Sequence, residues 1–468
     1  MRKKIIYYVS LFTTIVLLSL SLFSNFTYSP FNADNVKKSI AILSSDTYAG
    51  RLAGSKENSL LEELIRKNFQ DNKLIPLNDS YKESFKVISP VNNNSTPYLK
   101  ISYDDGYEEN LKYGVDFKED MINFKNTKIT FSNEDKVNVF SNYIEVSTTN
   151  GKFLFHLAPN NNFSFRSSFI HDFPYNMMVL INTDTYNKIL NSLRDGAEIS
   201  INIPFSTEEK EISNVVGVIK GTSKSLPPLV LTAHFDHLGT DALKNIYGGA
   251  LDNASGTSFM LELQKSLATY GKPKRDIIFV ALNAEEFGLL GSKAFAEKNL
   301  NKLKGAEVIN FDMIGSDNFP LTLMLGTNYK DKESKLLESI EKIAKRNNVN
   351  TKIAYENSSD HASFNLLDID SLSFCHSDLS KIHTPNDTVD YISIKAINEA
   401  YTVIEDKIFD SSYSIVTKFF YSKTSIYIFS FLFGFLVSAP FITHLKKCKI
   451  NNVKFRIVMY HQLSWWLD

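Results

Sequence analysis

The chain has 468 residues, a length typical of about three domains. Its 51 Lys and Arg residues are balanced by 52 Asp and Glu residues, which argues against a nucleic-acid-binding protein that relies on bulk positive charge. With 43% hydrophobic residues the chain can build a large core, and its two cysteines exclude a disulfide scaffold or a cysteine-rich zinc finger.

The N-terminus combines a basic cluster with an apolar segment. Arg2, Lys3 and Lys4 precede an uncharged run from Ile5 to Phe23. This combination is typical of an export signal, although no A-x-A cleavage site follows it. We therefore expect residues 1–30 to be either a cleaved signal peptide or an uncleaved anchor.

A second apolar segment lies near the other end of the chain. Residues 424–445 contain no Lys, Arg, Asp or Glu, and about twenty such residues span a bilayer, so we predict a transmembrane helix. Basic residues follow it within 446–456, and positive charge favours the cytoplasmic side. The N-terminal basic cluster gives the same orientation. We expect a cell-membrane protein, anchored once or twice, with residues 35–410 outside the cytoplasm and 446–468 as a cytoplasmic tail.

The first part of the exported region contains one clear helix and a β-rich stretch. Ser59 and Glu62 have the spacing of a capping box, which predicts the start of a helix. Residues 81–205 alternate short β-prone runs with Asn, Asp, Gly and Ser clusters, as in a β-rich module. A strand, a short helix and another strand are predicted between Met177 and Ile203.

After residue 214 the pattern changes to alternating strands and helices. Such alternation predicts an α/β fold with a mixed or parallel central sheet flanked by helices. We assign residues 35–80 and 210–410 to this domain and 81–205 to an insert. The predicted strands are 215–219, 229–233, 277–282, 307–311, 321–325 and 372–374, and the predicted helices are 255–270, 291–299, 334–346 and 392–409.

Acidic residues and histidines directly follow several of these strands or lie in glycine-containing loops. In open α/β sheets, sites form beyond the carboxyl ends of the strands. Imidazole and carboxylate groups suit zinc, and ligands from several loops can hold two metal ions ~3.5–4 Å apart, bridged by one carboxylate. One of two adjacent glutamates can bind metal while the other takes a proton from a metal-activated water. The segments are His234–His237, Gly248–Gly256, Asn283–Gly288, Asp312–Gly315 and His383–Thr388.

Taken together, the motifs resemble a known family. AHFDH, LDNASG, NAEEFGLLGS, NFDMIG, SDHASF and HTPNDT occur in the order found in the co-catalytic dizinc exopeptidases of the aminopeptidase Y and bacterial leucyl aminopeptidase type. The resemblance implies two zinc ions bridged by Asp252. One ion would also take His234 and Asp312, and the other Glu286 and His383.

The same resemblance implies the roles of further residues. Glu285 would be the general base, and Asp236 would orient the ligand His234. His237, Asp360 and His361 would support the pocket without binding metal. Arg51 lies in a loop that resembles one near the start of the family's peptidase domain. Residues 81–205 occupy the place where many members carry a protease-associated domain; the alternative is a generic β insertion.

The resemblance implies a membrane-anchored zinc aminopeptidase that hydrolyses N-terminal residues from peptide substrates. The alternatives are a carboxypeptidase or glutaminyl cyclase of the same fold, or a non-catalytic receptor-like member. Many family members have Tyr before the final histidine ligand, where it can polarise the substrate carbonyl. This chain has Ile382 there, so a side-chain oxyanion donor is not expected at that position.

Overall fold

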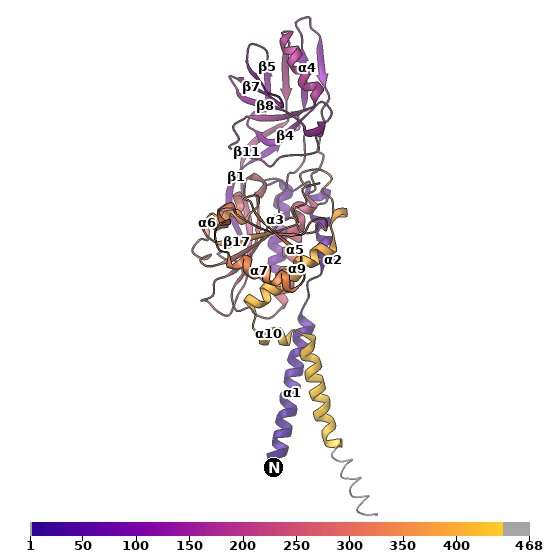
Figure 1. Cartoon of the computed structure of the whole chain (residues 1–468), viewed down its shortest axis with the longest axis vertical. Coiled ribbons are helices and arrows are strands. Elements are labelled where there is room, and N and C mark those ends of the chain that lie inside the picture. Colours follow the sequence, from indigo (N-terminus) through magenta and orange to yellow (C-terminus); the bar gives the residue numbers. More distant parts are fainter. Residues whose placement is uncertain (1, 443–468) are drawn as a thin grey trace, which may run out of the picture. The chain divides into compact units, whose positions relative to one another are not determined.

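A computed structural model of the chain describes residues 2–442 (Figure 1). The described residues fall into two compact units. One contains residues of the segments 1–30, 269–271 and 413–468, and the other contains residues 31–268 and 272–412.

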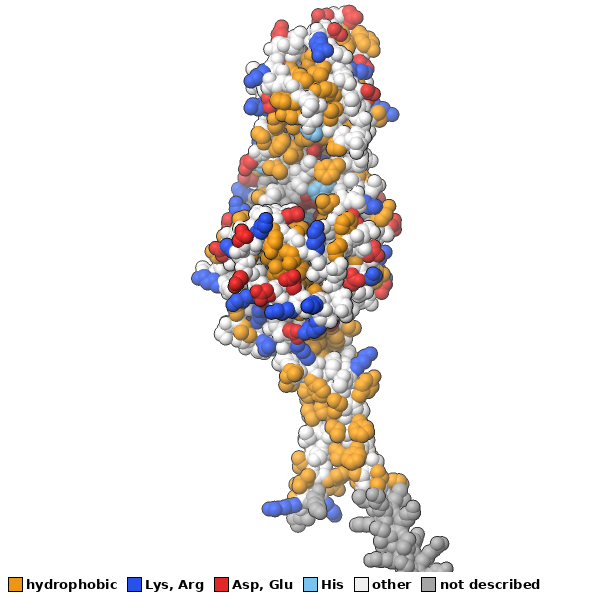
Figure 2. All heavy atoms as spheres, in the orientation of Figure 1, with side chains coloured by type: hydrophobic (Ala, Val, Ile, Leu, Met, Phe, Trp, Pro, Cys, Tyr) orange, Lys and Arg blue, Asp and Glu red, His pale blue; other side chains and the backbone are white. Residues whose placement is uncertain are grey.

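The first unit is built from apolar helices. They are α1 (Arg2–Thr27), α10 (Ile415–Phe420) and a helix over Lys423–Ile442. The Tyr7 hydroxyl donates a hydrogen bond to the Leu436 carbonyl at 3.1 Å, which links the two long helices. Their exposed side chains are largely apolar (Figure 2), and both helices are long and apolar enough to cross a membrane. The predicted apolar segments are therefore helical, while residues 443–468 lie outside the described residues.

In the described part of the chain, an eight-stranded mixed sheet forms the centre of the second unit, in the order β1-β11-β13-β12-β14-β17-β15-β16. The central strands β13, β12, β14 and β17 are parallel to one another, and β15 is parallel to β16. Antiparallel pairs join β1 to β11, β11 to β13, and β15 to β17. The strands span Lys82–Asn92 (β1), Phe205–Ile219 (β11), Leu229–His234 (β12), Ile277–Leu282 (β13), Glu307–Phe311 (β14), Leu321–Leu325 (β15), Thr351–Tyr355 (β16) and Asp370–Cys375 (β17).

Helices flank this sheet because its central strands are apolar along nearly their whole length. β12 and β13 are buried at every position, as expected of strands covered on both faces. This arrangement confirms the predicted α/β fold, and all six strands predicted after residue 214 are present. The helices span Ala33–Leu43 (α2), Lys56–Asp71 (α3), Gly256–Thr269 (α5), Leu290–Lys298 (α6), Lys335–Arg346 (α7), His361–Asn365 (α8) and Ile394–Ser412 (α9).

The β-rich insert forms two smaller sheets between β1 and β11. Their strand orders are β3-β2-β10-β5 and β4-β9-β8-β7-β6 among the described residues. The bounds are Tyr98–Ser102 (β2), Glu108–Leu111 (β3), Phe117–Phe124 (β4), Lys128–Phe131 (β5), Lys136–Val139 (β6), Tyr143–Thr148 (β7), Gly151–Leu157 (β8), Met177–Ile181 (β9), Thr183–Arg194 (α4) and Glu198–Asn202 (β10).

The predicted start of the insert at residue 81 requires a correction. β1 pairs along its whole length with β11, from Lys82 opposite Val215 to Asn92 opposite Phe205. This long ribbon is continuous with the central sheet, so the insert proper occupies residues 93–204. The sequence prediction failed here because β1 is as β-prone as the strands that follow it.

The start of α3 also differs from the prediction. The helix begins one turn earlier, where the Ser55 hydroxyl accepts a hydrogen bond from the Asn58 amide at 3.1 Å. Glu62 is buried and instead accepts a hydrogen bond from the Ser213 amide at 3.2 Å. The capping box of Ser59 and Glu62 is therefore wrong, because a tertiary contact uses the glutamate.

Candidate metal centre

The carboxyl ends of neighbouring parallel strands bring the predicted site residues together. His234 is the last residue of β12 and pairs in register with Leu282 at the end of β13, which Glu285 and Glu286 follow. Asp312 directly follows β14. Because parallel strands end at the same edge of a sheet, these side chains reach one site.

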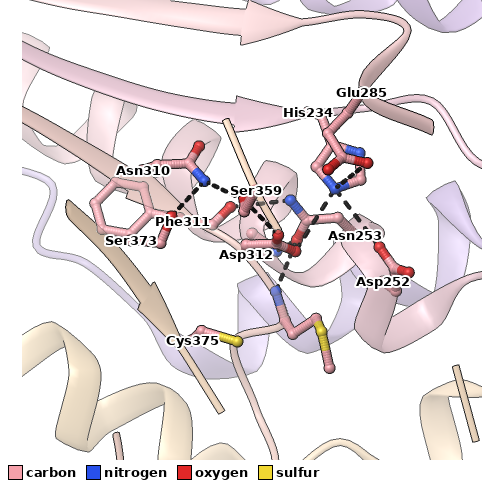
Figure 3. A network of polar contacts seen from close by, with 12 residues as sticks. His234, Asp252, Asn253, Glu285, Asn310, Phe311, Asp312, Ser359, Ser373 and Cys375 are labelled. Atoms are coloured by element: carbon pink, nitrogen blue, oxygen red, sulfur yellow. Dashed lines mark hydrogen bonds and ion pairs between the residues drawn. The ribbon is translucent and has the colours of Figure 1, made fainter. Parts of the chain in front are cut away.

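Two groups of side chains meet at Asp252, which lies in the turn before α5. Its Oδ1 is 3.5 Å from His234 Nε2, and its Oδ2 is 3.2 Å from His383 Nε2. In the first group, Asp312 Oδ1 is also 3.5 Å from His234 Nε2 (Figure 3). In the second group, Glu286 Oε1 is 3.5 Å from His383 Nε2. All five predicted ligands therefore lie in one site, with Asp252 between its halves.

The buried donor atoms of this site fit metal ions. His234 Nε2, Glu286 Oε1 and Asp312 Oδ1 are buried and make no hydrogen bond to any described residue. Buried polar atoms in folded proteins nearly always make hydrogen bonds, so several buried polar atoms without one in the same site need an explanation. Imidazole and carboxylate donors at this spacing suit a divalent cation such as zinc.

The charges of the site also favour a bound cation. Burial raises the pKa of the Glu285 carboxyl well above its usual value, and neighbouring carboxylates raise it further. Burial lowers the pKa of His383, but the Glu286 and Asp252 carboxylates outweigh burial and raise it to about 10. The site therefore concentrates negative charge that a bound cation would offset.

Comparison with known proteins finds a similarity in the α/β region. Residues 214–407 match the model of Peptidase family M28. This region is therefore similar to peptidase family M28, and we call residues 214–407 the M28 domain for that similarity. This match spans the predicted ligands and Glu285.

Individual relatives resemble parts of the chain. Aminopeptidase YwaD of Bacillus subtilis (strain 168) is 32% identical over 209 residues, which are 42% of this chain and 44% of that protein. A glutamate carboxypeptidase 2 homolog of Caenorhabditis elegans is 35% identical over 124 residues, 25% of this chain and 15% of that protein. The chain thus covers less than half of the length of these curated relatives.

A solved structure shares the fold. The structure of BSAP, a zinc aminopeptidase from Bacillus subtilis, aligns with a TM-score of 0.55 at 18% identity, covering 82% of this chain and 96% of that chain. At this level of identity the similarity concerns the fold. It agrees with the mixed sheet described above.

Asp236 contacts the backbone of Glu285 and Glu286. Its carboxylate accepts hydrogen bonds from the backbone amides of Glu285 at 3.1 Å and Glu286 at 3.2 Å. His234 Nδ1 is 3.7 Å from Asp236 Oδ1, which is longer than a hydrogen bond. Asp236 therefore fixes the glutamate turn, and its role in orienting His234 stays a prediction.

Two residues hold the loop that carries Asp252, and their roles were missed in the sequence. The Asp387 carboxylate accepts hydrogen bonds from the amides of Leu251 at 2.8 Å and Asp252 at 3.0 Å. The buried Arg51 guanidinium donates to the carbonyls of Gly249 at 2.7 Å and Asp252 at 3.2 Å. Asp387 lies in the HTPNDT motif, which was the available signal, whereas the sequence offers no sign of the Arg51 contacts.

A chain of polar side chains supports Asp312 from the opposite side (Figure 3). The Ser359 hydroxyl donates to Asp312 Oδ2 at 2.6 Å, and the Asn310 amide donates to the Ser359 hydroxyl at 2.9 Å. Ser359 begins the SDHASF motif. Because one oxygen of Asp312 is held in this way, its Oδ1 remains directed toward His234.

His237 is closer to the ligands than the sequence suggested. It is fully buried, and its Nδ1 is 2.9 Å from Glu286 Oε1 and 3.9 Å from Asp252 Oδ2. The ring packs against Gly249, where an added Cβ would come within 2.5 Å of it. With Asp252 and Glu286, His237 forms a group that could itself hold a metal ion, so its role as a support that binds no metal stays a prediction.

Proposed function

We propose that the chain is a zinc-dependent aminopeptidase that removes N-terminal residues from peptides outside the cytoplasm. The observation that carries this proposal is Asp252, whose two carboxylate oxygens lie 3.5 Å from His234 Nε2 and 3.2 Å from His383 Nε2. Such a carboxylate between two imidazoles suits a bridged pair of zinc ions. The M28 domain and the aminopeptidase relatives support the same activity.

The proposed ligands would divide between two ions, with Asp252 shared by both. His234 and Asp312 would hold one ion, and Glu286 and His383 the other. When bound, the zinc ions polarise a carbonyl group and acidify water. Glu285 Oε2 lies 3.9 Å from His234 Nε2, in the same group of side chains as His234 and Asp312. Its carboxylate takes the proton of the attacking water and delivers it to the leaving amine.

Recognition of the substrate terminus favours an aminopeptidase over a carboxypeptidase. The acidic site suits a free α-amine, whereas a carboxypeptidase needs cations aimed at the α-carboxylate. Lys293 is exposed on α6. Lys381 Nζ lies over the Tyr391 ring, 4.0 Å from its centroid. Neither lysine is placed as a receptor for a carboxylate, although one relative is a carboxypeptidase homolog.

The arrangement of the chain in the membrane is a further part of the proposal. Residues 424–445 would form the transmembrane anchor, with or without the N-terminal helix, and the M28 domain would lie outside the cytoplasm. The support is the basic flank of both apolar segments. Residues 93–204 would form a protease-associated-like insert in this exported region.

A panel of three matched peptides tests the activity. The purified full-length chain in detergent, loaded with zinc, is incubated with one sequence as the free peptide, its N-acetyl form and its C-terminal amide. We expect hydrolysis of the free and amidated peptides and loss of hydrolysis on N-acetylation. Cleavage of the acetylated peptide with refusal of the amide would favour a carboxypeptidase. Failure on all three with two zinc ions bound would favour a binding role.

A further inference from the structure

A short segment of the insert, residues 165–169 between β8 and β9, contacts the M28 domain beside the proposed ligands. The Arg166 amide donates to the His383 carbonyl at 2.9 Å. In return, His383 Nδ1 lies 3.0 Å from the Arg166 carbonyl oxygen. The Phe165 ring stacks on the His383 ring with their centroids 5.5 Å apart. The insert therefore fixes both the backbone and the ring of this histidine.

The same segment holds a second ligand. The Ser168 hydroxyl donates to Glu286 Oε2 at 2.5 Å, and the Phe169 amide donates to the Glu286 carbonyl at 2.9 Å. The Phe169 ring meets the Phe287 ring edge to face, 5.2 Å between centroids. Side chain and main chain of Glu286 are thus both bound to the insert, 118 residues away in sequence.

The segment is itself anchored on both sides. Ser167 donates to the Asp120 carboxylate in β4 from its amide at 2.9 Å and from its hydroxyl at 2.8 Å. The fully buried Arg166 guanidinium donates to the Leu238 carbonyl at 3.1 Å. Because both the insert and the M28 domain hold these residues, the segment can fix the ligands rather than follow them.

These contacts are selective for one half of the site. Glu286 and His383 are the two residues assigned to the same ion. Among the hydrogen bonds of the described residues, none joins this segment to His234 or Asp312. Asp312 is instead held by Ser359 of the M28 domain.

We propose that residues 165–169 of the insert position the metal site of Glu286 and His383, with Ser168 as the positioning residue. The inference rests on the proposed function in that it takes these two residues as metal ligands. Ser168 holds Glu286 Oε2, so that Oε1 faces the site. The Arg166 carbonyl accepts the Nδ1 proton of His383 and leaves Nε2 free to bind. The insert thereby sets the affinity for one ion and leaves the other unchanged.

The test measures zinc affinity in variants of two adjacent serines. Full-length protein in detergent is stripped of metal and titrated with zinc against a chromophoric chelator, which gives a dissociation constant for each ion. In Ser168→Ala we expect ~10–100-fold weaker binding of one ion, the usual effect of losing such a partner, and wild-type binding of the other. Ser168→Thr keeps the hydroxyl and should restore most of the affinity.

Ser167→Ala is the matched control, because Ser167 bonds to Asp120 and not to a ligand. Because its amide keeps the hydrogen bond to Asp120, Ser167→Ala should weaken zinc binding clearly less than Ser168→Ala does. Wild-type binding in Ser168→Ala would overturn the inference, and so would equal weakening in Ser167→Ala, which would indicate a general effect of the insert. If the affinities follow the expectation but no peptide is cleaved, the proposed function fails while the inference stands. If the wild type binds no zinc, both fail.

Discussion

The geometry of the site depends most on residues that touch two partners at once. Asp252 faces His234 with one oxygen and His383 with the other. Glu286 faces His383 with Oε1 and Ser168 with Oε2. We therefore expect a substitution at either position to act on metal binding, and a substitution of Glu285, the proposed base, to act on proton transfer.

Glu285→Gln separates these two effects. The amide keeps the size of the side chain but cannot accept the proton, so turnover should fall by at least ~10²-fold. Zinc content should stay near the wild-type value, because the five ligands are unchanged. Near-normal turnover, measured with metal analysis on the same sample, would reject Glu285 as the base. Asp252→Ala should lose metal together with activity.

Asp378 gives a prediction about pH. Burial raises its pKa, but hydrogen bonds from Ser380, Ser316 and Asn318 outweigh burial and lower it to about 2. An unfolded Asp titrates near ~3.9, so the ionised group stabilises the fold above that pH, and this contribution is lost as pH falls toward 2. In metal-free protein, Asp378→Asn should lower the melting temperature at neutral pH, and the difference from wild type should shrink between pH 4 and 2. A difference that does not change with pH would contradict this.

Sequence patterns indicated the proposed ligand residues but not the residues that hold them. His234, Glu286 and Asp312 could be predicted because each follows an apolar strand at the same edge of a sheet. Ser168 and Arg51 could not, because their contacts join segments 118 and about 200 residues apart. No local periodicity records such a contact.

At the scale of elements, apolar strands were predicted well and boundaries poorly. β12, β13 and β14 are short apolar runs, and a buried strand is the structure that fits such runs best. β16, with residues such as Lys352 and Ile353 exposed, has no such pattern and was not predicted. The predicted start of α3 was wrong because Ser55 and Ser59 both precede apolar positions of the helix.

The cap of α3 can be tested with these two serines. Ser55→Ala removes the acceptor for the Asn58 amide and should cost about 1 kcal/mol of the free energy of unfolding. The unit that contains α3 is larger than 250 residues, so this is a fall of at most about 2 °C in melting temperature. Ser59→Ala should change it little, because Ser59 lies inside the helix and its hydroxyl bonds to the Ser55 carbonyl. A larger effect of Ser59→Ala would restore the sequence-based assignment.

At the scale of the whole molecule, the α/β fold followed from alternating strands and helices, while the division of the chain did not. The β1–β11 ribbon joins the insert to the central sheet, and residues 165–169 join it to the site. A boundary drawn from composition misses both connections. The insert therefore contributes directly to the structure of the site.

Orientation in the membrane is tested in intact cells. Both apolar segments carry basic residues on the flank expected to face the cytoplasm. Protease added outside should digest the region 35–410 and spare a tag placed after Asp468. Digestion of the tag in sealed cells would reverse the orientation; a tag on a known cytoplasmic protein serves as the control for sealing.

Peptide hydrolysis by this chain should depend on a pair of zinc ions that share Asp252. The most direct measurement is a zinc titration of metal-free, full-length protein, followed by the rate of cleavage of a peptide with a free N-terminus. We predict no cleavage without metal and a rate that reaches its plateau at about two zinc ions per chain. Full activity in the metal-free protein, or a plateau that Asp252→Ala also reaches, would contradict it.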